Sequence, residues 1–427
     1  MICSLHSSSR RGRQKGAVLV TVALTMLFLL GFMGVALDFG RLFVIKSELQ
    51  TSMDSCALAA AQELDSQADA LVRANNAGLN AGNQNRVDFQ NANWGGLGQL
   101  VTTDITYRDA NYIPTTAPAA ARYAQCQHTQ TGAPTWLLQA LGAFSGNPLL
   151  APGARNVMAS AVATKGSAMS TCPIPVAAYP KAGGVAPDYG YTVGEWITLL
   201  MDQSAVSGGN IGWANLDGSN SASETVAEMS GKCGTKIGDT LGTPGTQTAV
   251  ADVWNWRFGI YKNSTGPNEH APDYSGYAYT TTNWPSGSSA YDGATPAGAH
   301  ATAANYVTKK AARANCANTT STSSVNACES IIGRTLNSFQ KLAPGGTTAV
   351  DGHQRYGTMR RIVTVPVMGP GNHVADFLCM FMLQPLSIPM GNVQLEYLGN
   401  ASLAGSPCVT NGLPGGSAGP LVPVLVR

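Results

Sequence analysis

The sequence has few charged residues, and this shortage excludes several classes of protein. Lys and Arg number 26 and Asp and Glu 24 among 427 residues, so only 12% are charged, against roughly a quarter in a typical soluble domain. A net charge of +2 is too small for a protein that binds nucleic acid by neutralising phosphates. The 44% of hydrophobic residues excludes disorder driven by charge. The 48 Gly and 23 Pro favour turns and strands over coiled coils.

The sequence also lacks common signatures of metal and nucleotide sites. It contains no CxxC pair, no HExxH helix, no GxGxxG fingerprint and no GxxxxGK[ST] loop. The six histidines lie far apart, at positions 6, 128, 270, 300, 353 and 373. We therefore expect solvated histidines, no catalytic residues and no cofactor. A Ser/His/Asp grouping assembled by the fold stays open.

One uncharged run is long enough to cross a membrane. The 22 residues from Gly16 to Leu37, GAVLVTVALTMLFLLGFMGVAL, are followed by Asp38. As a helix rising about 1.5 Å per residue they span roughly 33 Å, which matches the hydrocarbon core of a bilayer. Residues 1–15 carry four basic and no acidic residues. The positive-inside rule therefore predicts that this basic leader is cytoplasmic and that the chain after Asp38 lies outside the cytoplasm.

A cleaved signal peptide is the alternative interpretation of this run. The run is longer than a usual signal core, and Ala36-Leu37-Asp38-Phe39 leads into more helix rather than into a cleavage loop of small residues. We therefore favour a retained anchor. No second run of comparable length follows, so we expect a single-pass protein. The C-terminal LVPVLV (421–426) is predicted to form a buried strand.

The helix is expected to continue beyond the membrane as a stalk over residues 38–64. Small or apolar residues recur there at steps of three and four, namely Leu42, Ile45, Leu49, Met53, Cys56, Ala60 and Leu64. This spacing places them on one helix face. That face must pack against the chain's own sheet or against another protein, so oligomerisation through the stalk stays open.

The segment that includes the run and the stalk resembles a known family. The stretch RRGRQKGAVLVTVALTMLFLLGFMGVALDFGRLFVIKSELQTSMDSCALAAAQELD is similar to the N-terminal module of TadG-like (Tad, tight adherence) pilus-assembly proteins. The matching elements are the basic entry before Gly16-Ala17, the close of the span on Leu37-Asp38-Phe39-Gly40-Arg41, Ser47-Glu48-Leu49-Gln50, and Asp54 with the small run 57–61. A weaker similarity reaches about residue 165.

The resemblance implies a single-pass protein of the bacterial inner membrane, within the envelope machinery that builds Flp-type pili. Its partners would be pilus-assembly or secretion-machinery proteins. One position departs from the related type IV prepilins, which carry Glu five residues after the processed Gly. Here the fifth residue after Gly16 is Thr21. The departure argues against processing and entry into a filament, and it favours an assembly factor over a pilin.

Residues 38–166 are predicted to combine the stalk with a small α+β, pilin-like module. Residues 67–85 and 134–142 favour short helices. Alternation predicts antiparallel strands in VTTDITYRD (101–109), RYAQCQHTQ (122–130) and ARNVMASAVATKG (154–166).

The composition changes at Cys172, after which Gly, Ser, Thr, Asn and aromatic residues with closely spaced turn signals predict a β-rich periplasmic domain over residues 172–427. Its strand candidates are PIPVAAYP, NIGWANLD, RRIVTVPVMG, ADFLCMFMLQPL and NVQLEYLGNA, and residues 262–325 are loop-rich. The predicted fold class is therefore α+β: a transmembrane helix continuing into an amphipathic stalk, a small antiparallel sheet, and a β-rich disulfide-bearing domain.

Cysteine usage fits an oxidising compartment. Cys3 precedes the span and should stay reduced, which leaves eight cysteines outside the cytoplasm. Eight cysteines allow 105 pairings, so the sequence does not determine the connectivity. Proximity favours three pairs, with Cys56 and Cys126 as the remainder. The three pairs are Cys316–Cys328, Cys379–Cys408 and Cys172–Cys233. For Cys56, burial as a small free residue is an equal alternative.

The segment Asp217-Gly218-Ser219-Asn220-Ser221 has the DxSxS spacing of a metal-ion-dependent adhesion site. Such a site needs a carboxylate and two hydroxyls that converge on a hard cation beyond a buried parallel strand. The preceding NIGWANL contains Asn and Gly where such a strand should be continuously apolar, and no α/β alternation is predicted after it. We therefore favour an Asp-Gly turn between strands and no metal. Asp217, Ser219 and Ser221 are the alternative metal ligands.

An aromatic cluster formed by Trp254, Trp256, Phe258 and Tyr261 alternates in part, as do Ile211 and Trp213. A carbohydrate- or peptide-binding platform on a strand is one interpretation. Core packing in a β domain is the interpretation we favour.

Two functions are therefore expected. The first is a membrane-anchored periplasmic component of Tad-type pilus assembly that contacts lipid through residues 16–37, binds proteins, and neither catalyses a reaction nor binds nucleic acid. The second is a membrane-anchored adhesin with a metal at Asp217. An anchored hydrolase with a site assembled from loops is a weaker third.

Overall fold

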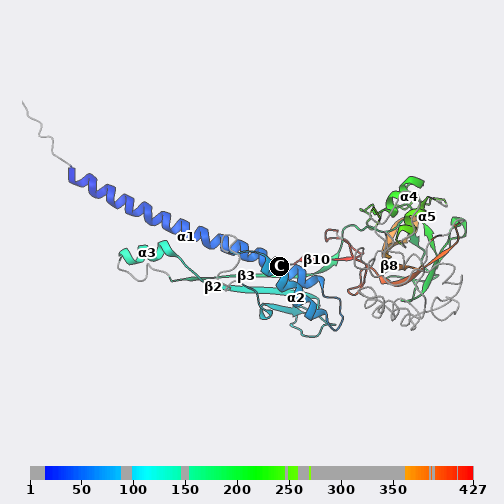
Figure 1. The fold of residues 1–427 in the computed structure, drawn as a ribbon, viewed down its shortest axis with the longest axis horizontal. Helices are drawn as coiled ribbons and strands as arrows, with labels where there is room; N and C mark the ends of the chain where they lie inside the picture. Colours follow the sequence, from blue (N-terminus) through cyan, green and yellow to red (C-terminus); the bar gives the residue numbers. More distant parts are fainter. Residues whose placement is uncertain are drawn as a thin grey trace, which may run out of the picture. The chain divides into compact units, whose positions relative to one another are not determined.

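Two units make up the part of the chain that the computed structural model describes, which is residues 15–87, 99–145, 153–245, 249–257, 269–270, 361–383, 386, 390–410 and 412–426. Unit 1 comprises Met1–Glu63, Ala68–Thr164 and Leu425–Arg427, and unit 2 comprises Leu64–Gln67 and Lys165–Val424. Figure 1 shows the helices and strands of both. The long N-terminal helix, the sheets and the disulfides confirm the predicted α+β class.

Unit 1 is built on one long helix, α1 (Lys15–Gln62), which runs without a break for 48 residues. From residue 45 onward its buried side chains follow the predicted face, namely Ile45, Leu49, Met53, Cys56 and Ala60. Leu42 is half-buried at the start of this face, and Leu64 is buried just beyond the end of the helix. The spacing of small and apolar residues thus predicted the packed side of the stalk.

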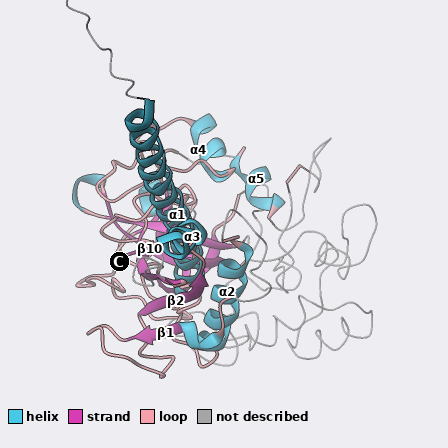
Figure 2. Cartoon of the chain, turned by 90° about the vertical axis from the view of Figure 1, so that its left-hand side faces the viewer, coloured by secondary structure: helices cyan, strands magenta, loops and turns pink. Residues whose placement is uncertain are grey.

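A four-stranded sheet packs against α1 in the order β1-β2-β3-β10. The first three strands are antiparallel neighbours, with a bulge between Gln130 and Ala133. Figure 2 looks nearly along α1 and shows helices α2 and α3 close to it. The elements are α2 (Ala70–Gln84), the 3-10 turn η1 (Thr102–Asp104), β1 (Ile105–Arg108), β2 (Tyr123–Ala133), α3 (Trp136–Ser145), β3 (Arg155–Ser167) and β10 (Leu421–Leu425).

The C-terminal strand β10 is less buried than the sequence predicted. Val422 is buried, but Leu425 and Val426 are 38% and 51% exposed. The reason is its position, because β10 lies at the edge of the sheet. Pro423 has no amide hydrogen to donate to a further strand, which suits an edge.

Unit 2 contains a closed six-stranded β-barrel in the order β4-β6-β5-β9-β8-β7. The β4–β7 and β5–β6 pairs are parallel and the other four neighbouring pairs are antiparallel. The strands are β4 (Val176–Ala178), β5 (Trp196–Leu199), β6 (Ile211–Trp213), β7 (Ile362–Met368), β8 (Val374–Met382) and β9 (Val393–Asn400). Two 3-10 turns, η3 (Gln203–Ala205) and η4 (Pro370–Asn372), lie in connections. Each of the five strand candidates PIPVAAYP, NIGWANLD, RRIVTVPVMG, ADFLCMFMLQPL and NVQLEYLGNA overlaps one barrel strand, whereas β5 was not predicted.

Two helices in unit 2 correct the sequence-based interpretation. Helix α4 (Ala222–Met229) directly follows the Asp217 loop, where a second strand was expected. Helix α5 (Val250–Trp256) carries Trp254 and Trp256, so the alternative of an aromatic platform on a strand is wrong for these two residues, whereas Trp254 packs in the core as favoured. Trp254 is fully buried, and its ring meets that of Trp213 edge-on, with centroids 6.0 Å apart. Burial in the barrel core therefore decides the conformation of this segment. Phe258 and Tyr261 lie outside the described residues.

Three disulfides join the cysteines that the structure describes. Cys56–Cys126 links α1 to β2 in unit 1, whereas Cys172–Cys233 and Cys379–Cys408 lie in unit 2. All three pairs are among those named from the sequence. The fourth pair, Cys316–Cys328, lies outside the described residues, as does nearly all of the loop-rich stretch 262–325.

Candidate functional site

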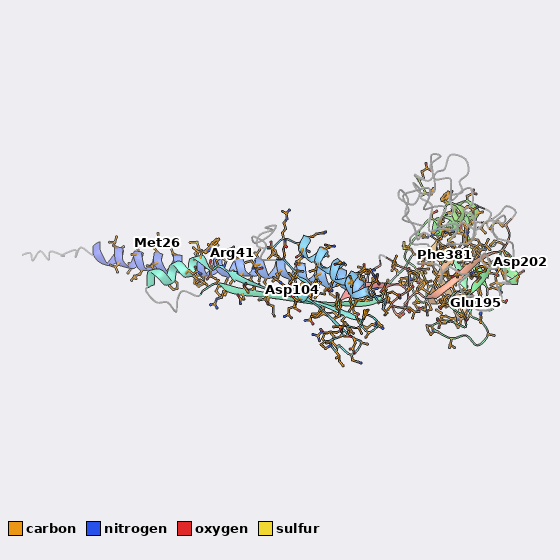
Figure 3. All side chains as sticks on the ribbon, turned by 60° about the horizontal axis from the view of Figure 1, so that its bottom comes forward. Met26, Arg41, Asp104, Glu195, Asp202 and Phe381 are labelled. Atoms are coloured by element: carbon orange, nitrogen blue, oxygen red, sulfur yellow. A yellow bond between two sulfur atoms is a disulfide. The ribbon has the colours of Figure 1, made fainter. Side chains whose placement is uncertain are left out.

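The N-terminal half of α1 presents apolar side chains on all sides. Every Val, Leu, Met and Phe from Val18 to Leu30 is more than half exposed, and Met26, for example, is 61% exposed (Figure 3). The hydroxyls of Thr21 and Thr25 donate to the carbonyls of Val18 and Thr21 at 3.0 and 2.8 Å, so backbone acceptors satisfy them within the helix. Among the described residues, α1 is the one helix long and apolar enough to cross a membrane.

The apolar run ends where α3 meets α1. Asp38 is only 6% exposed, and its Oδ2 accepts the Leu138 N–H at 2.8 Å. Leu138 is in the first turn of α3, where backbone N–H groups lack partners within the helix and a negative charge is favourable. The Arg41 guanidinium lies 4.4 Å from the centroid of the Trp136 ring. A side chain of α1 therefore caps α3, and a second one stacks on its first residue.

The stalk is packed closely against α2 and β2. Gly78 and Gly82 let α2 approach α1, since a Cβ atom on Gly82 would lie 3.1 Å from Cys56 Cβ and 2.3 Å from Leu100 Cδ1. The Ser52 hydroxyl donates to the Gly82 carbonyl at 2.9 Å. The Cys56–Cys126 disulfide adds a covalent link to β2, an inner strand of the sheet. These contacts hold the stalk to its own sheet.

The opposite side of the stalk is open. Phe39, Phe43, Ser47 and Thr51 follow one another at steps of four, and all four are exposed. We call these four residues the outer stripe. Phe43 is 72% exposed, and the Thr51 hydroxyl donates to the Ser47 carbonyl at 3.1 Å. The outer stripe changes from aromatic to small and polar with distance from the apolar run, and it offers the free surface of the stalk.

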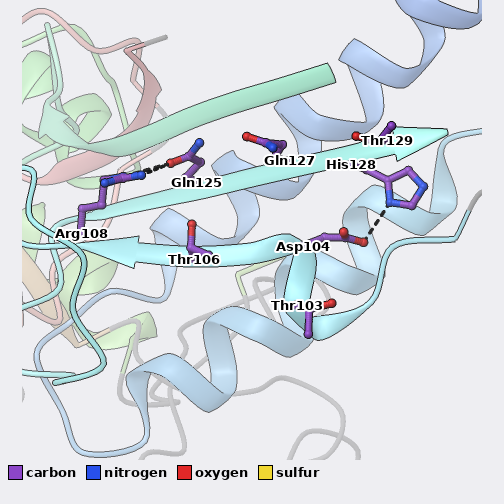
Figure 4. A pocket seen from close by; sticks show the side chains of 8 residues that line it. All are labelled: Thr103, Asp104, Thr106, Arg108, Gln125, Gln127, His128 and Thr129. Carbon is purple, nitrogen blue, oxygen red and sulfur yellow. Dashed lines mark hydrogen bonds and ion pairs between the residues drawn. The ribbon is translucent and has the colours of Figure 1, made fainter. Parts of the chain in front are cut away.

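A polar groove of about 500 Å³ lies over β1 and β2 (Figure 4). His128 Nδ1 is 3.0 Å from Asp104 Oδ2, and the Arg108 guanidinium donates to Gln125 Oε1 at 2.8 and 2.9 Å. His128 lies on β2, within the strand predicted over residues 122–130, and it is largely buried, which corrects the expectation of a solvated histidine. The remaining lining residues are Thr103, Thr106, Gln127 and Thr129.

The Asp217 segment forms a hydrogen-bonded loop between β6 and α4. Asp217 Oδ1 accepts the Ser219 N–H at 2.9 Å, and the Ser219 hydroxyl accepts from Asn215 Nδ2 at 3.2 Å. The Ser221 hydroxyl lies 2.9 Å from that of Ser223. The hydroxyls of Ser219 and Ser221, the two in the alternative metal site, thus have partners in the loop and in the first turn of α4. Partial burial raises the pKa of Asp217, but the hydrogen bonds from the Ser219 backbone and side chain and the charge of Lys232 together hold it below its ordinary value.

Two carboxylates of α4 approach Asp217, which the sequence analysis missed. One oxygen each of Asp217, Glu224 and Glu228 lies within 4.8 Å of the others. The Lys232 ammonium pairs with Glu224 and lies 3.9 Å from Asp217. Burial raises the pKa of Glu228 to about 7. The Leu216 N–H, which lies 2.9 Å from both carboxylate oxygens of Glu228, lowers this pKa, and repulsion from Asp217 raises it further. Because a lysine already supplies positive charge, this arrangement is best described as an ion-pair network.

Other candidate groups are dispersed. His373 Nδ1 lies 3.0 Å from the Gly238 carbonyl, and the His270 ring stacks on Trp256, with centroids 3.5 Å apart. His6, His300 and His353 lie outside the described residues. Residues 415–419, GGSAG, have the GxSxG spacing of a hydrolase elbow, yet they form a loop before β10 with an exposed Ser417 and no following helix. The strand-to-helix turn that activates such a serine is therefore missing there.

Comparison with known proteins gives one match. Residues 16–63 match the Tad family model, which describes Flp pilus-assembly TadE/G-like proteins. The matched residues coincide with α1, covering both its exposed apolar half and its packed half. The resemblance seen in the sequence is thereby confirmed for this segment. No curated protein and no solved structure matches the chain significantly.

Proposed function

We propose that this chain is a single-pass inner-membrane component of the machinery that assembles Tad-type, Flp pili. Residues 1–15 face the cytoplasm, residues 16–37 contact lipid, and the remainder lies in the periplasm. It acts through protein–protein contacts, with no catalysis or cofactor of its own. The observation that carries this proposal is that the matched Tad segment is one continuous helix, exposed and apolar in its first half and packed in its second.

The packing of the stalk limits which surfaces can bind a partner. A pilin-like helix that enters a filament must offer an apolar face to other copies. Here the apolar face of the stalk is filled by the chain's own α2 and β2 and is fixed by the Cys56–Cys126 disulfide. A second copy or another pilus-assembly or secretion protein would therefore contact the exposed apolar half of α1, the outer stripe or the barrel.

A pull-down from bacterial envelopes tests this role. The full chain should recover pilus-assembly or secretion proteins, and Thr51→Trp in the outer stripe should reduce their recovery. The matched control is Val72→Trp, because Val72 is 63% exposed on α2, away from the stripe. Recovery of no such protein by the unmodified chain would contradict the proposal.

Cys3 offers a test of the proposed orientation. A thiol reagent that does not cross membranes should label Cys3 only after the inner membrane is opened. Labelling of Cys3 in intact spheroplasts would place the N-terminus outside and refute the orientation. Loss of Cys3 from the mature protein, measured by mass spectrometry, would show cleavage of the segment.

The alternative function is an anchored adhesin with a metal at Asp217, Ser219 and Ser221. The proximity of Asp217, Glu224 and Glu228 is the observation that favours it. Calorimetric titration of the detergent-solubilised chain with Mg²⁺ and Mn²⁺ separates the two functions. We expect no saturable binding, since Lys232 already pairs with these carboxylates. Binding that Asp217→Ala abolishes would favour the adhesin.

A further inference from the structure

The connection between β2 and β3 has an unusual composition for a loop. Residues 134–154, PTWLLQALGAFSGNPLLAPGA, contain no Asp, Glu, Lys, Arg or His. Connections between strands normally run over the surface and carry polar side chains that water can solvate. Helix α3 lies within this connection, and Trp136 and Leu137 are 64% and 42% exposed. Among the described residues, the first turn of this apolar helix contacts α1 on one side and leaves Trp136 and Leu137 exposed.

The position of α3 along α1 indicates what surrounds it. A Cβ atom on Gly34 would lie 3.2 Å from Leu137 Cβ, so the first turn of α3 is level with the last turn of the uncharged run. Figures 1 and 3 show α3 lying beside α1 and extending toward the N-terminal end of α1, to about the level of Met26. The helix thus runs alongside the membrane-spanning part of α1 and away from the stalk.

The length and the polar contacts of α3 fit insertion into one leaflet. Its 10 residues span about 15 Å, roughly half of the hydrocarbon core. Asp38, which accepts the Leu138 N–H, satisfies a backbone donor that would be costly to leave unpaired at the membrane boundary. Trp and Arg are the residues that favour this boundary, and Trp136 and Arg41 stack there.

We propose that α3 is a re-entrant element that inserts beside α1 into the leaflet next to the stalk, with lipid acyl chains covering its exposed apolar side chains. The occupant is lipid because α3 shares its level with residues 26–37 of α1. This inference rests on the proposed function, which places that part of α1 in the membrane. The chain would then hold the membrane at two points, through α1 and through α3.

Spin labels in the full chain test this inference. In a Cys3→Ser background, single cysteines replace Leu137 on α3, Met33 on α1 and Val72 on α2, which are all exposed apolar positions. Each is labelled with a nitroxide after reconstitution in vesicles of phosphatidylethanolamine and phosphatidylglycerol, and the unsubstituted background reports labelling elsewhere. Mass spectrometry without reduction verifies that Cys56–Cys126 stays formed.

Accessibility to oxygen and to a water-soluble nickel complex gives the result. We expect Leu137 and Met33 to favour oxygen, as lipid-facing sites do, and Val72 to favour nickel. Leu137 favouring nickel while Met33 favours oxygen would overturn the inference and leave the membrane anchor intact. Low accessibility of Leu137 to both reagents would mean that protein covers it, which also overturns the inference. Met33 favouring nickel would refute the membrane anchor itself.

Trp136, one of the seven tryptophans of the chain, gives a second measurement that introduces no label. Lipids brominated near the headgroup should quench part of the tryptophan emission. Trp136→Phe should abolish that quenched part, because Trp136 stands at the boundary of the apolar run. Equal quenching in the chain with and without Trp136→Phe would contradict the insertion of α3.

Discussion

The Cys56–Cys126 disulfide should supply a large share of the resistance of unit 1 to unfolding. It closes a loop with a sequence separation of 70 residues between the stalk and the middle of the sheet. Restricting the unfolded chain by a loop of this length is worth about 4 kcal/mol. Since every 1.4 kcal/mol is a factor of ten, losing the bond should raise the unfolding equilibrium constant roughly a thousandfold. Both cysteines are fully buried, so the variant to test is Cys56→Ala with Cys126→Ala.

Hydrogen exchange measured by mass spectrometry on the full chain in detergent is the appropriate assay. Peptides from 45–62 and 123–130 report unit 1 separately from the barrel, and their slowest amides exchange through cooperative unfolding. We expect the protection of these amides to fall by about three orders of magnitude. The matched control is Cys379→Ala with Cys408→Ala, which removes a disulfide of unit 2 and should leave unit 1 unchanged.

Reduction of the unmodified protein separates loop closure from packing, because it breaks the same bond without removing atoms. It should reproduce the loss measured for the double variant. If reduction lowers the protection of these amides by less than about tenfold, loop closure is not the source of the stabilisation, even if the double variant is strongly destabilised.

Three further changes have defined outcomes. Asp38→Ala removes the acceptor of the Leu138 N–H and should cost about 1.5–3 kcal/mol locally, seen as faster exchange in residues 136–142; unchanged exchange would contradict it. Gly82→Val forces a side chain against Leu100 and Cys56, and it should destabilise unit 1 by about 1–3 kcal/mol, measured by thermal unfolding. The control is Gly40→Val, which should not destabilise unit 1 because nothing lies within 4 Å of a Cβ atom at that position. The pKa of Glu228 is about 7 in the fold against 4.5 ordinarily, so the folded state binds more protons between these values. The free energy of unfolding of unit 2 should therefore rise by about 3 kcal/mol as pH falls from above 7 to below 4.5, and Glu228→Gln should abolish this dependence; an equal slope in the variant would refute the assignment.

The sequence predicted those features that depend on local spacing. Ile45, Leu49 and Cys56 fall on one helix face whatever packs against it, so the buried side of the stalk could be identified in advance. Strand segments were also found, because alternating and β-branched runs favour strands in many settings.

Closure of the barrel was not predictable, because it depends on pairs far apart in the chain such as Ala178 with Val367. Helix α5 was not predicted, since VADVWNW contains strand-favouring residues, and burial of Trp254 against Trp213 determines its conformation. At the candidate site, the Asp38–Leu138 contact joins residues 100 positions apart, beyond any local signal. The spacing of Glu224, Glu228 and Lys232 at steps of four was a usable signal for the ion-pair network.

The parallel pairing of β4 with β7 also determines how early in synthesis the barrel can close. Ala178 pairs with Val367, which the ribosome adds 189 residues later. At about 5–20 residues per second this delay lasts roughly 10–40 s. Throughout that interval the β4-β6-β5 sheet has two unpaired edges, one on β4 and one on β5, and such edges attract other chains. A nascent chain that stalls before residue 362 would thus be an aggregation hazard, and a chaperone that shields strand edges would be needed most in this period.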